Sequence, residues 1–305
     1  MWQGCLGPFL QGDVLSKIYR ERKYFTGLKM DYIQRLEEAM HQIETYKPEY
    51  IAKCLQYAQK LLVSELPVLF DRKHVNMVLK MWQLKFPCYN LFYIKSKRKY
   101  REIVAPSLKL KRRQRWILEN ILEKIPLSQY CHGFVHGRSI VTNARTHIGK
   151  DRILTMDIQD FFPSIKEEQV REVFQSAGYS FSAAERLTEI CCFQGKLPQG
   201  APSSPYLANL FCRKMDGELG EIARKYELIY TRYADDMTFS GDKDLEFLIP
   251  LVEDTLQKYG FSANKEKTRI GKNHKMVTGL LIEENTLKVP KYFKRRLKQE
   301  IYYCK

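Results

Sequence analysis

The spacing of hydrophobic residues predicts a helical first part of the chain and a mixture of strands and helices after it. Over residues 1–86, apolar side chains recur every three or four positions, which is the period of an amphipathic helix. Between residues 89 and 104, two runs of apolar and aromatic residues flank a cation-rich segment, Lys95 to Lys99. This pattern predicts a β-hairpin whose basic tip suits either phosphate binding or the protection of an edge strand. We therefore expect an α+β protein with a helical N-terminal region.

A second predicted hairpin carries two adjacent acidic residues at its tip. Apolar and β-branched residues between Leu228 and Ser240 flank Asp235 and Asp236, which predicts two strands joined by a tight turn. Neighbouring carboxylates repel each other, so the turn is either a solvated acidic loop or a site that holds a cation. A third aspartate, Asp157, ends an earlier apolar stretch. If these strands are neighbours in one sheet, the three carboxylates converge.

Three converging carboxylates predict a site for divalent cations. They cannot all stay ionised unless cations screen them, and oxygen ligands suit Mg²⁺ or Mn²⁺. Two such ions about 3.5–4 Å apart stabilise both the attacking and the leaving oxygen in phosphoryl transfer. Together with the basic hairpin, this pattern indicates phosphoryl transfer on nucleic acid, by either polymerisation or hydrolysis.

The overall charge indicates a polyanionic partner. The 305 residues include 51 Lys and Arg against 35 Asp and Glu, a formal net charge of +16, which favours nucleic acid or an acidic membrane surface. No apolar run approaches the roughly 20 residues needed to span a bilayer, and the first residues lack the pattern of a signal peptide. The eight cysteines include no C-x-x-C pair, so we expect reduced thiols in a cytoplasmic protein.

Two further segments place polar residues in unusual surroundings. Ser139 can cap a helix on which Asn143 and His147 lie four residues apart on one face, a spacing that permits a joint contact without requiring one. The segment Leu197–Pro205 is nearly free of charge, and its small residues would let a backbone or a flat ligand approach Gln199 closely.

Local signals also predict the ends of two other elements. Ser182 and Glu185 have the spacing of a capping box, which predicts the start of a helix. Residues 277–282 and 286–289 are predicted to form the two strands of a hairpin.

The order of these motifs points to a known family. Three segments resemble, in order and spacing, sequence blocks of reverse transcriptases: Tyr233-Ala234-Asp235-Asp236, Asp157 followed by Phe161-Phe162, and Leu197–Pro205. Two more are similar to the N-A-x-x-H motif and the V-T-G triplet of bacterial retron reverse transcriptases: Asn143 to His147, and Val277-Thr278-Gly279. The resemblance covers residues 88 to 290.

The resemblance implies a right-hand polymerase fold, with an antiparallel palm sheet packed on helices. It assigns 1–86 to a helical N-terminal region, 87–150 and 166–200 to the fingers, 151–165 and 201–275 to the palm, and 276–305 to a primer-grip hairpin and the start of the thumb. Because few residues follow Gly279, we expect a thumb that is short, truncated or partly replaced by the N-terminal region.

The resemblance also implies roles for individual residues. Two Mg²⁺ ions, or Mn²⁺, would be held by the catalytic residues Asp157, Asp235 and Asp236 and by the carbonyl of Ile158. The nucleotide would be bound by Lys99, Arg101, Phe162, Gln199 and Lys267. Within this group, Phe162 would be an aromatic gate against the sugar 2′-OH unless it is a core residue, and Lys265 is an alternative to Lys267. RNA or primer would be contacted by Arg138, Asn143, His147, Tyr233, Val277, Thr278 and Gly279.

Within that family, the retron resemblance implies a specific reaction. Such an enzyme copies part of its own structured non-coding RNA from a guanosine 2′-OH into a short DNA that stays linked to RNA, the msDNA. These systems serve in antiphage defence, often with a separate effector protein. The expected partners are therefore dNTPs, the cognate RNA, its DNA product and an effector. The alternatives are another bacterial reverse transcriptase, of the intron or a defence-associated type, and a non-catalytic RNA-binding scaffold.

Overall fold

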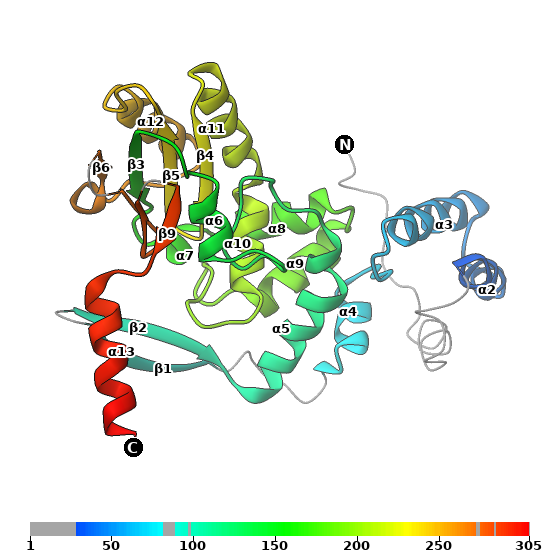
Figure 1. Ribbon diagram of the computed structural model, residues 1–305. Helices are drawn as coiled ribbons and strands as arrows, with labels where there is room; N and C mark the ends of the chain where they lie inside the picture. The colour runs from blue at the N-terminus through cyan, green and yellow to red at the C-terminus, as the bar shows by residue number, and fades with distance from the viewer. Residues whose placement is uncertain (1–28, 82–88, 97–98, 273–274, 284, 305) are drawn as a thin grey trace. The chain divides into compact units, whose positions relative to one another are not determined.

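The chain forms two compact units, each built from helices and antiparallel strands (Figure 1). The computed structural model describes residues 29–81, 89–96, 99–272, 275–283 and 285–304. Unit 1 comprises residues 1–126 and 166–207, and unit 2 comprises residues 127–165 and 208–305. The predicted α+β class is confirmed. In the described part of the chain, no helix combines the length and the apolar character that a bilayer crossing needs.

Unit 1 combines several helices with a two-stranded sheet. The helices are α2 (Lys29–His41), α3 (Pro48–Val63), α4 (Arg72–Val78), α5 (Leu108–Asn120), the short η2 (Leu122–Lys124), α8 (Glu167–Ser176) and α9 (Phe181–Cys191). Strands β1 (Tyr89–Ser96) and β2 (Lys99–Pro106) pair in antiparallel register, with Tyr89 opposite Pro106. This pair is the basic hairpin that the sequence predicts.

The start of α9 corrects a predicted helix cap. Ser180 is the N-cap residue, because its Oγ accepts a hydrogen bond from the Ala183 N–H at 3.3 Å. The expected cap at Ser182 is wrong, since Ser182 Oγ accepts a hydrogen bond from the Arg72 N–H at 3.2 Å instead. A contact between elements distant in the sequence therefore uses the oxygen that the local pattern assigned to the cap.

The centre of unit 2 is a four-stranded antiparallel sheet in the order β4-β5-β3-β6. Its strands are β3 (Arg152–Asp157), β4 (Ile229–Tyr233), β5 (Asp236–Gly241) and β6 (Arg269–Gly271). The helices near it are α6 (Ile140–Arg145), α7 (Phe161–Ser164), α11 (Arg213–Lys225), α12 (Leu248–Lys258) and η3 (Lys265–Lys267), while α10 (Ser204–Phe211) spans the boundary between the units. Because β3 lies beside β5, Asp157 becomes a neighbour of the acidic hairpin.

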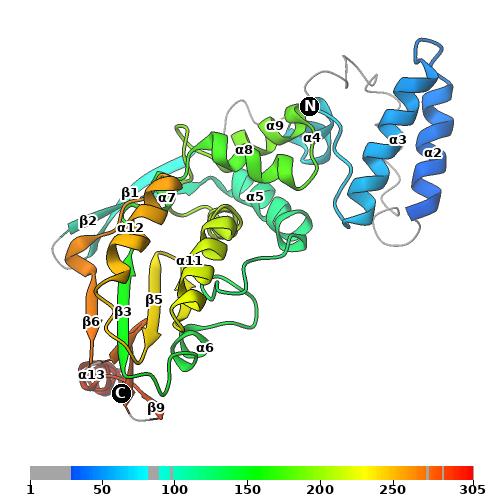
Figure 2. The same cartoon turned by 90° about the horizontal axis from the view of Figure 1, so that it is seen from above.

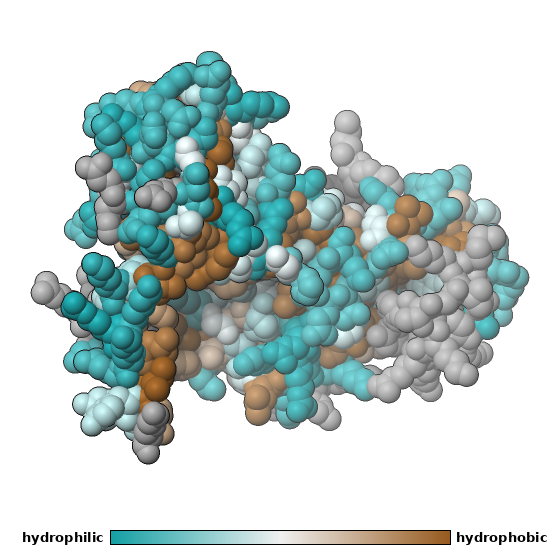
Figure 3. Space-filling model, viewed as in Figure 1, coloured by the Kyte–Doolittle hydropathy of each residue, from teal (hydrophilic) through white to brown (hydrophobic). Residues whose placement is uncertain are grey.

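The pleat of this sheet separates a helix-covered face from an acidic face. Arg232 donates hydrogen bonds to Asp216 of α11, so Arg232 faces that helix, which packs side by side with α12 (Figure 2). The next residue, Tyr233, points to the opposite face. Tyr233 pairs directly with Asp236, and Asp236 pairs with Asp157. Directly opposed residues share a face, so the acidic residues lie away from α11, whose outer surface with α12 is largely hydrophilic (Figure 3).

A three-stranded meander follows the main sheet. Its strands are β7 (Lys275–Val277), β8 (Leu280–Glu283) and β9 (Thr286–Lys288). The expectation of one strand over 277–282 is wrong, because Thr278 and Gly279 form a turn between β7 and β8. Both have positive φ, 44° and 82°, as a two-residue hairpin turn with two left-handed residues requires. The final helix, α13 (Lys291–Tyr303), exposes its side chains along its whole length.

A small hydrophobic cluster joins this meander to α6 and β3. Its buried members are Ala144, Ile153, Val277, Leu280 and Ile282. Ile148 and Leu287, which are partly buried, pack against it. The cluster fixes α6 between the meander and the acidic sheet.

Candidate active site

The turn between β4 and β5 presents the two adjacent aspartates. Ala234 and Asp235 alone join the strands, since Tyr233 pairs with Asp236. Ala234 has a φ of 56°, a left-handed conformation that costs a non-glycine residue about 1–3 kcal/mol. Surrounding contacts must therefore hold the turn. One comes from the end of β3, where the Ile158 N–H donates to the Asp235 carbonyl at 2.9 Å.

The three aspartates form one electrostatic cluster. The pKa of Asp236 is raised to about 6, first by desolvation of its carboxyl and then by the negative charges of Asp235 and Asp157. Asp236 is solvent-exposed as a residue, so desolvation of its carboxyl is incomplete. The two neighbouring carboxylates raise its pKa independently of burial. Ionisation of Asp236 is therefore less favourable beside the other two carboxylates, and a cation bound between them would relieve this repulsion.

Lys267 supplies the nearest positive charge. Its Nζ lies 2.6 Å from Asp157 Oδ2, and its ammonium opposes the rise in the pKa of Asp236. Lys265, the alternative in the same short helix, makes no such contact within the described part of the chain. The geometry therefore favours Lys267 as the lysine of the acidic cluster.

The cluster has the ligand types that a hard divalent cation needs. Three carboxylates are available, and the Ile158 carbonyl accepts no hydrogen bond from any described residue. Among the described residues, no three His, Cys, Asp or Glu side chains converge tightly enough to hold an ion, and Lys267 contacts one Asp157 oxygen. Metal binding here thus requires displacement of Lys267 and rotation of aspartate side chains, whereas the donor set itself fits.

A buried ion pair supports the acidic turn from the helix-covered face. Arg232 Nε and Nη2 donate to the two Asp216 carboxylate oxygens at 2.7 and 2.8 Å, and both side chains are fully buried. Arg232 Nη1 donates to Asn209 Oδ1 at 3.1 Å and to the Ala234 carbonyl at 2.9 Å. The Tyr230 hydroxyl completes the network by donating to Asp216 at 2.9 Å. The guanidinium therefore connects α11 to the strained residue of the turn.

The sequence analysis did not identify this pair, although a signal was present. Arg232 and Tyr230 lie two residues apart on one face of β4, and Asp216 follows Met215 on the buried side of α11. A charge at such a position needs a buried partner, but the sequence does not show which residue provides it.

A loop before α6 lies against the turn. A Cβ added to Gly133 would come within 2.5 Å of the Ala234 nitrogen, so only glycine permits this approach. The Gly133 carbonyl accepts a hydrogen bond from Asn209 Nδ2 at 2.8 Å. Arg138, a predicted RNA or primer contact, donates through Nη1 to the carbonyls of Gln129 and Cys131 at 2.6 and 2.5 Å. In this structure Arg138 therefore links the end of the loop to the backbone at its start.

Phe162 lies in α7, five residues after Asp157. Its neighbour Phe161 is buried, only 5% exposed, whereas Phe162 is partly exposed. The rings of Phe161 and Phe162 have centroids 5.3 Å apart. Phe161 therefore fills the core position, and Phe162 remains accessible at the surface of the unit.

Asn143 and His147 are fully buried. His147 Nδ1 lies 2.7 Å from Ser240 Oγ, and its Nε2 lies 2.7 Å from Thr231 Oγ1. Asn143 Nδ2 donates to Thr278 Oγ1 over a long 3.5 Å, and Asn143 Oδ1 has no hydrogen-bond partner in the described part. Neither side chain offers a surface to RNA here. The predicted helix is shorter than expected, because α6 ends at Arg145 and His147 lies in the turn that follows it. Asn143 of α6 contacts the turn after β7, and His147 contacts both strands of the acidic hairpin.

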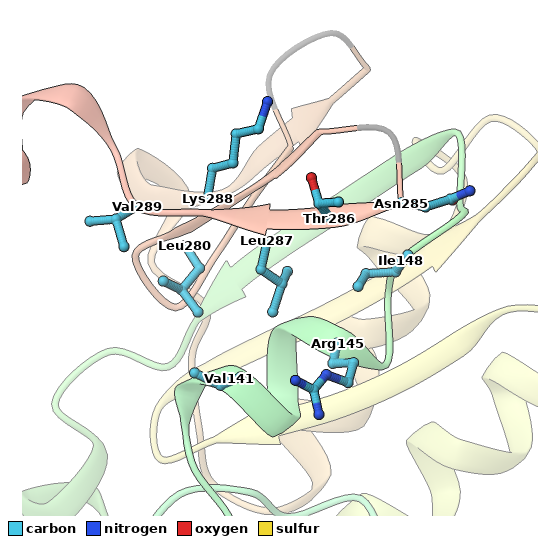
Figure 4. Close-up of a pocket in the computed structure, with 9 residues that line it drawn as sticks. All are labelled: Val141, Arg145, Ile148, Leu280, Asn285, Thr286, Leu287, Lys288 and Val289. Carbon is cyan, nitrogen blue, oxygen red and sulfur yellow. The ribbon is translucent and has the colours of Figure 1, made fainter.

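A surface groove of about 460 Å³ runs between α6 and β9 (Figure 4). Leu280 and Leu287 point toward α6, which contributes Val141 and Arg145 to the opposite side. Arg145 is exposed and makes no ion pair with any described residue. The groove is therefore the accessible surface beside the buried Asn143 and His147, next to the turn of Thr278 and Gly279.

The remaining predicted nucleotide-binding residues belong to unit 1. The Gln199 carbonyl accepts a hydrogen bond from the Val104 N–H at 2.9 Å, and Gly200, with φ of 132°, packs against the Val104 carbonyl. The Leu197–Pro205 segment thus lies on β2, with the Gln199 side chain partly exposed. Lys99 and Arg101 are in β2, but their side chains lie outside the described residues.

Comparison with known proteins gives a consistent result. Residues 93–282 match the family model of reverse transcriptase (RNA-dependent DNA polymerase). The retron Ec86 reverse transcriptase of Escherichia coli is 39% identical over 229 residues, covering 71% of this chain and 70% of the relative. The retron Mx162 reverse transcriptase of Myxococcus xanthus is 34% identical over 239 residues, covering 66% and 49%. The retron Se72 reverse transcriptase of Salmonella heidelberg is 32% identical over 246 residues, covering 77% and 65%.

A solved structure supports the fold. Telomerase from Candida albicans, in complex with a fragment of telomeric RNA, superposes with a TM-score of 0.50 at 14% identity, covering 80% of this chain and 50% of that chain. At this identity the similarity concerns the fold alone, and the family rests on the sequence matches. The chain belongs to the reverse transcriptase family, and within it to the bacterial retron reverse transcriptases.

Proposed function

We propose that this protein is an RNA-directed DNA polymerase that transfers nucleotides with the help of two divalent metal ions. The observation that carries the proposal is the register that sets Asp157 opposite Asp236, on one face of an antiparallel sheet. Bound there, two ions would lower the pKa of the attacking primer hydroxyl and neutralise charge on the transferred phosphate. Mg²⁺ is our first expectation, with Mn²⁺ as the alternative.

The residues of the chain would bind and orient the reactants. Asp157, Asp235, Asp236 and the Ile158 carbonyl would hold the metals. Lys267 then leaves Asp157 and stabilises the pyrophosphate leaving group, which its length and its exposed position permit. Tyr233, on the same face as Asp236, contacts the primer end, and Phe162 packs against the sugar of the incoming nucleotide.

Unit 1 would supply the remaining nucleotide contacts. Lys99 and Arg101 of β2 bind the triphosphate, and Gln199 contacts the nucleotide. We assign the β1–β2 hairpin and residues 166–200 to the fingers, the four-stranded sheet to the palm, and the meander with α13 to the primer grip and the start of the thumb. Residues 127–150 pack with unit 2, so we assign them to the support of the palm rather than to the fingers.

The template would be a structured RNA encoded with the protein. The names of the relatives at 32–39% identity, each a retron reverse transcriptase, support this choice, as does the net charge of +16. We propose that the protein copies part of this RNA into a short DNA that stays joined to RNA, in the bacterial cytoplasm and in antiphage defence with an effector protein. Its RNA contacts include the α6–β9 groove and the turn of Thr278 and Gly279, whereas the predicted contact Val277 is fully buried in the hydrophobic cluster and supports that turn from below.

Two measurements test the proposal. Incorporation of dNTPs on an RNA template should require a divalent metal and should be abolished in Asp235→Asn, while circular dichroism shows an unchanged fold. Sequencing of the nucleic acid that co-purifies should reveal a branched molecule of RNA and short DNA. Incorporation without a branched product would favour another reverse transcriptase lineage, and bound RNA without incorporation would favour a non-catalytic scaffold.

A further inference from the structure

An exposed phenylalanine in a strained conformation lies beside Phe162. Phe134 has a φ of 58°, where bulky residues are rare, and its side chain is 51% exposed. A side chain this exposed gains little hydrophobic stabilisation, so burial does not offset the cost of the strained backbone. Strained residues of this kind gather at functional sites, so the conformation of Phe134 calls for a functional explanation.

The backbone around Phe134 is fixed to the acidic turn and its supporting strand. Gly133 touches the Ala234 nitrogen so closely that no Cβ fits. The His132 N–H donates to the Arg232 carbonyl at 2.7 Å, and the Arg138 side chain closes the loop. Phe134 is therefore held at a defined place relative to the acidic cluster.

Phe134 forms an aromatic pair with Phe162. The two ring centroids are 6.5 Å apart with the planes at 55°, within the range of attractive aromatic pairs. Phe162 also pairs with Phe161, and Phe161 packs against Phe261 with centroids 5.8 Å apart. Because Phe162 is already partly exposed, loss of Phe134 would leave Phe161 as its one remaining aromatic partner among the described residues and would let the Phe162 ring move more freely.

We propose that Phe134 is a positioning residue that fixes Phe162 and thereby sets the discrimination between deoxyribonucleotides and ribonucleotides. This inference rests on the proposed polymerase function and on the contact of Phe162 with the sugar. A gate excludes one additional hydroxyl only if it does not move when the hydroxyl presses on it. The contact with Phe134 removes that freedom.

The experiment measures single-nucleotide incorporation with dNTP and with rNTP on the same RNA template. The readout is the ratio of the two kcat/KM values, which does not depend on the fraction of correctly folded enzyme. The variants are Phe134→Ala, Phe162→Ala, the double variant and Phe134→Tyr. Phe247→Ala is the matched control, because Phe247 is 41% exposed in the same unit and packs on Tyr226 with centroids 4.8 Å apart.

Phe134→Ala should lower the dNTP preference by about two- to tenfold, the range expected for one aromatic contact. Phe134→Tyr and Phe247→Ala should keep the wild-type ratio. The double variant should equal Phe162→Ala, since Phe134 acts through Phe162. An unchanged ratio in Phe134→Ala, or additive losses in the double variant, would overturn the inference while wild-type activity upholds the polymerase. An inactive wild type would remove the polymerase function and this inference with it.

Discussion

At the scale of single residues, the acidic turn depends on buried charges that lie behind it. Arg232 satisfies Asp216, Asn209 and the Ala234 carbonyl together, so one side chain stabilises both a buried carboxylate and a strained backbone. The three aspartates were predictable because Asp157 ends one strand pattern and Asp235 and Asp236 lie at the turn between two others. Arg232 and Asp216 were not, because their pairing arises only when α11 packs on β4.

Removing Arg232 should be more damaging than removing both partners of the ion pair. Arg232→Met leaves Asp216 buried without a counter-ion and should lower the free energy of unfolding by about 3–5 kcal/mol. Arg232→Met with Asp216→Leu should recover most of that loss, since no charge stays buried. Urea denaturation measures both. Nucleotide incorporation should stay low in the double variant, because the Ala234 carbonyl still lacks its hydrogen-bond donor. Full activity of the double variant would contradict the role of Arg232 in supporting the acidic turn.

Asp236 should make the apo protein less stable as the pH rises. Its pKa is raised to about 6 in the folded protein from 3.8, so the folded state binds the proton more tightly than the unfolded state. Stability therefore falls as the pH rises from about 4 to 6, and the penalty stays at higher pH. Asp236→Asn removes the penalty. Its thermal midpoint should exceed that of the wild type at pH 8 and match it near pH 4.

Magnesium provides the control for that comparison. The ion screens the carboxylates, so it should raise the midpoint of the wild type at pH 8 more than that of Asp236→Asn. An equal response of both proteins, or a less stable variant at pH 8, would contradict the carboxylate cluster.

At the scale of elements, α6 acts as a connector. The sequence predicted its Ser139 cap, which the structure confirms with a capping box to Thr142, because capping is local. The burial of His147 was not predictable from a spacing of four residues. Burial lowers the pKa of His147 to about 3, so the neutral ring can donate to one hydroxyl and accept from the other, joining β4 to β5.

Variants at Arg145 of α6 and at His147, in the turn after it, distinguish a structural role from an RNA-binding role. His147→Ala should lower the free energy of unfolding by about 1–3 kcal/mol for each of the Thr231 and Ser240 hydroxyls left unsatisfied. It should leave the salt dependence of RNA binding unchanged. Arg145→Ala, at the exposed groove, should keep stability and reduce the slope of log K against log salt by about 0.7 for one lost phosphate contact. Fluorescence anisotropy of labelled RNA measures the slopes. A changed slope in His147→Ala, or an unchanged slope in Arg145→Ala, would contradict the assignment of RNA contact to the groove.

At the scale of the whole molecule, the order of strands is the feature that brings the chemistry together. The hairpin of β4 and β5 could be predicted because its strands are adjacent in the chain. The insertion of β3 between β5 and β6 pairs segments far apart in sequence, and no local pattern encodes such pairing. The family resemblance implied a palm sheet, whereas the register of Asp157 opposite Asp236 came from the structure.

Asp157, Asp235 and Asp236 should form a metal-dependent polymerase site. Its most direct test is single-dNTP incorporation on a primed RNA template, with and without Mg²⁺, for each Asp→Asn variant. Asp254→Asn is the control, since Asp254 is an exposed acid on α12. We expect Mg²⁺-dependent incorporation by the wild type and Asp254→Asn, and a loss of at least about a thousandfold in the three cluster variants. Near-normal incorporation by any folded cluster variant would contradict it.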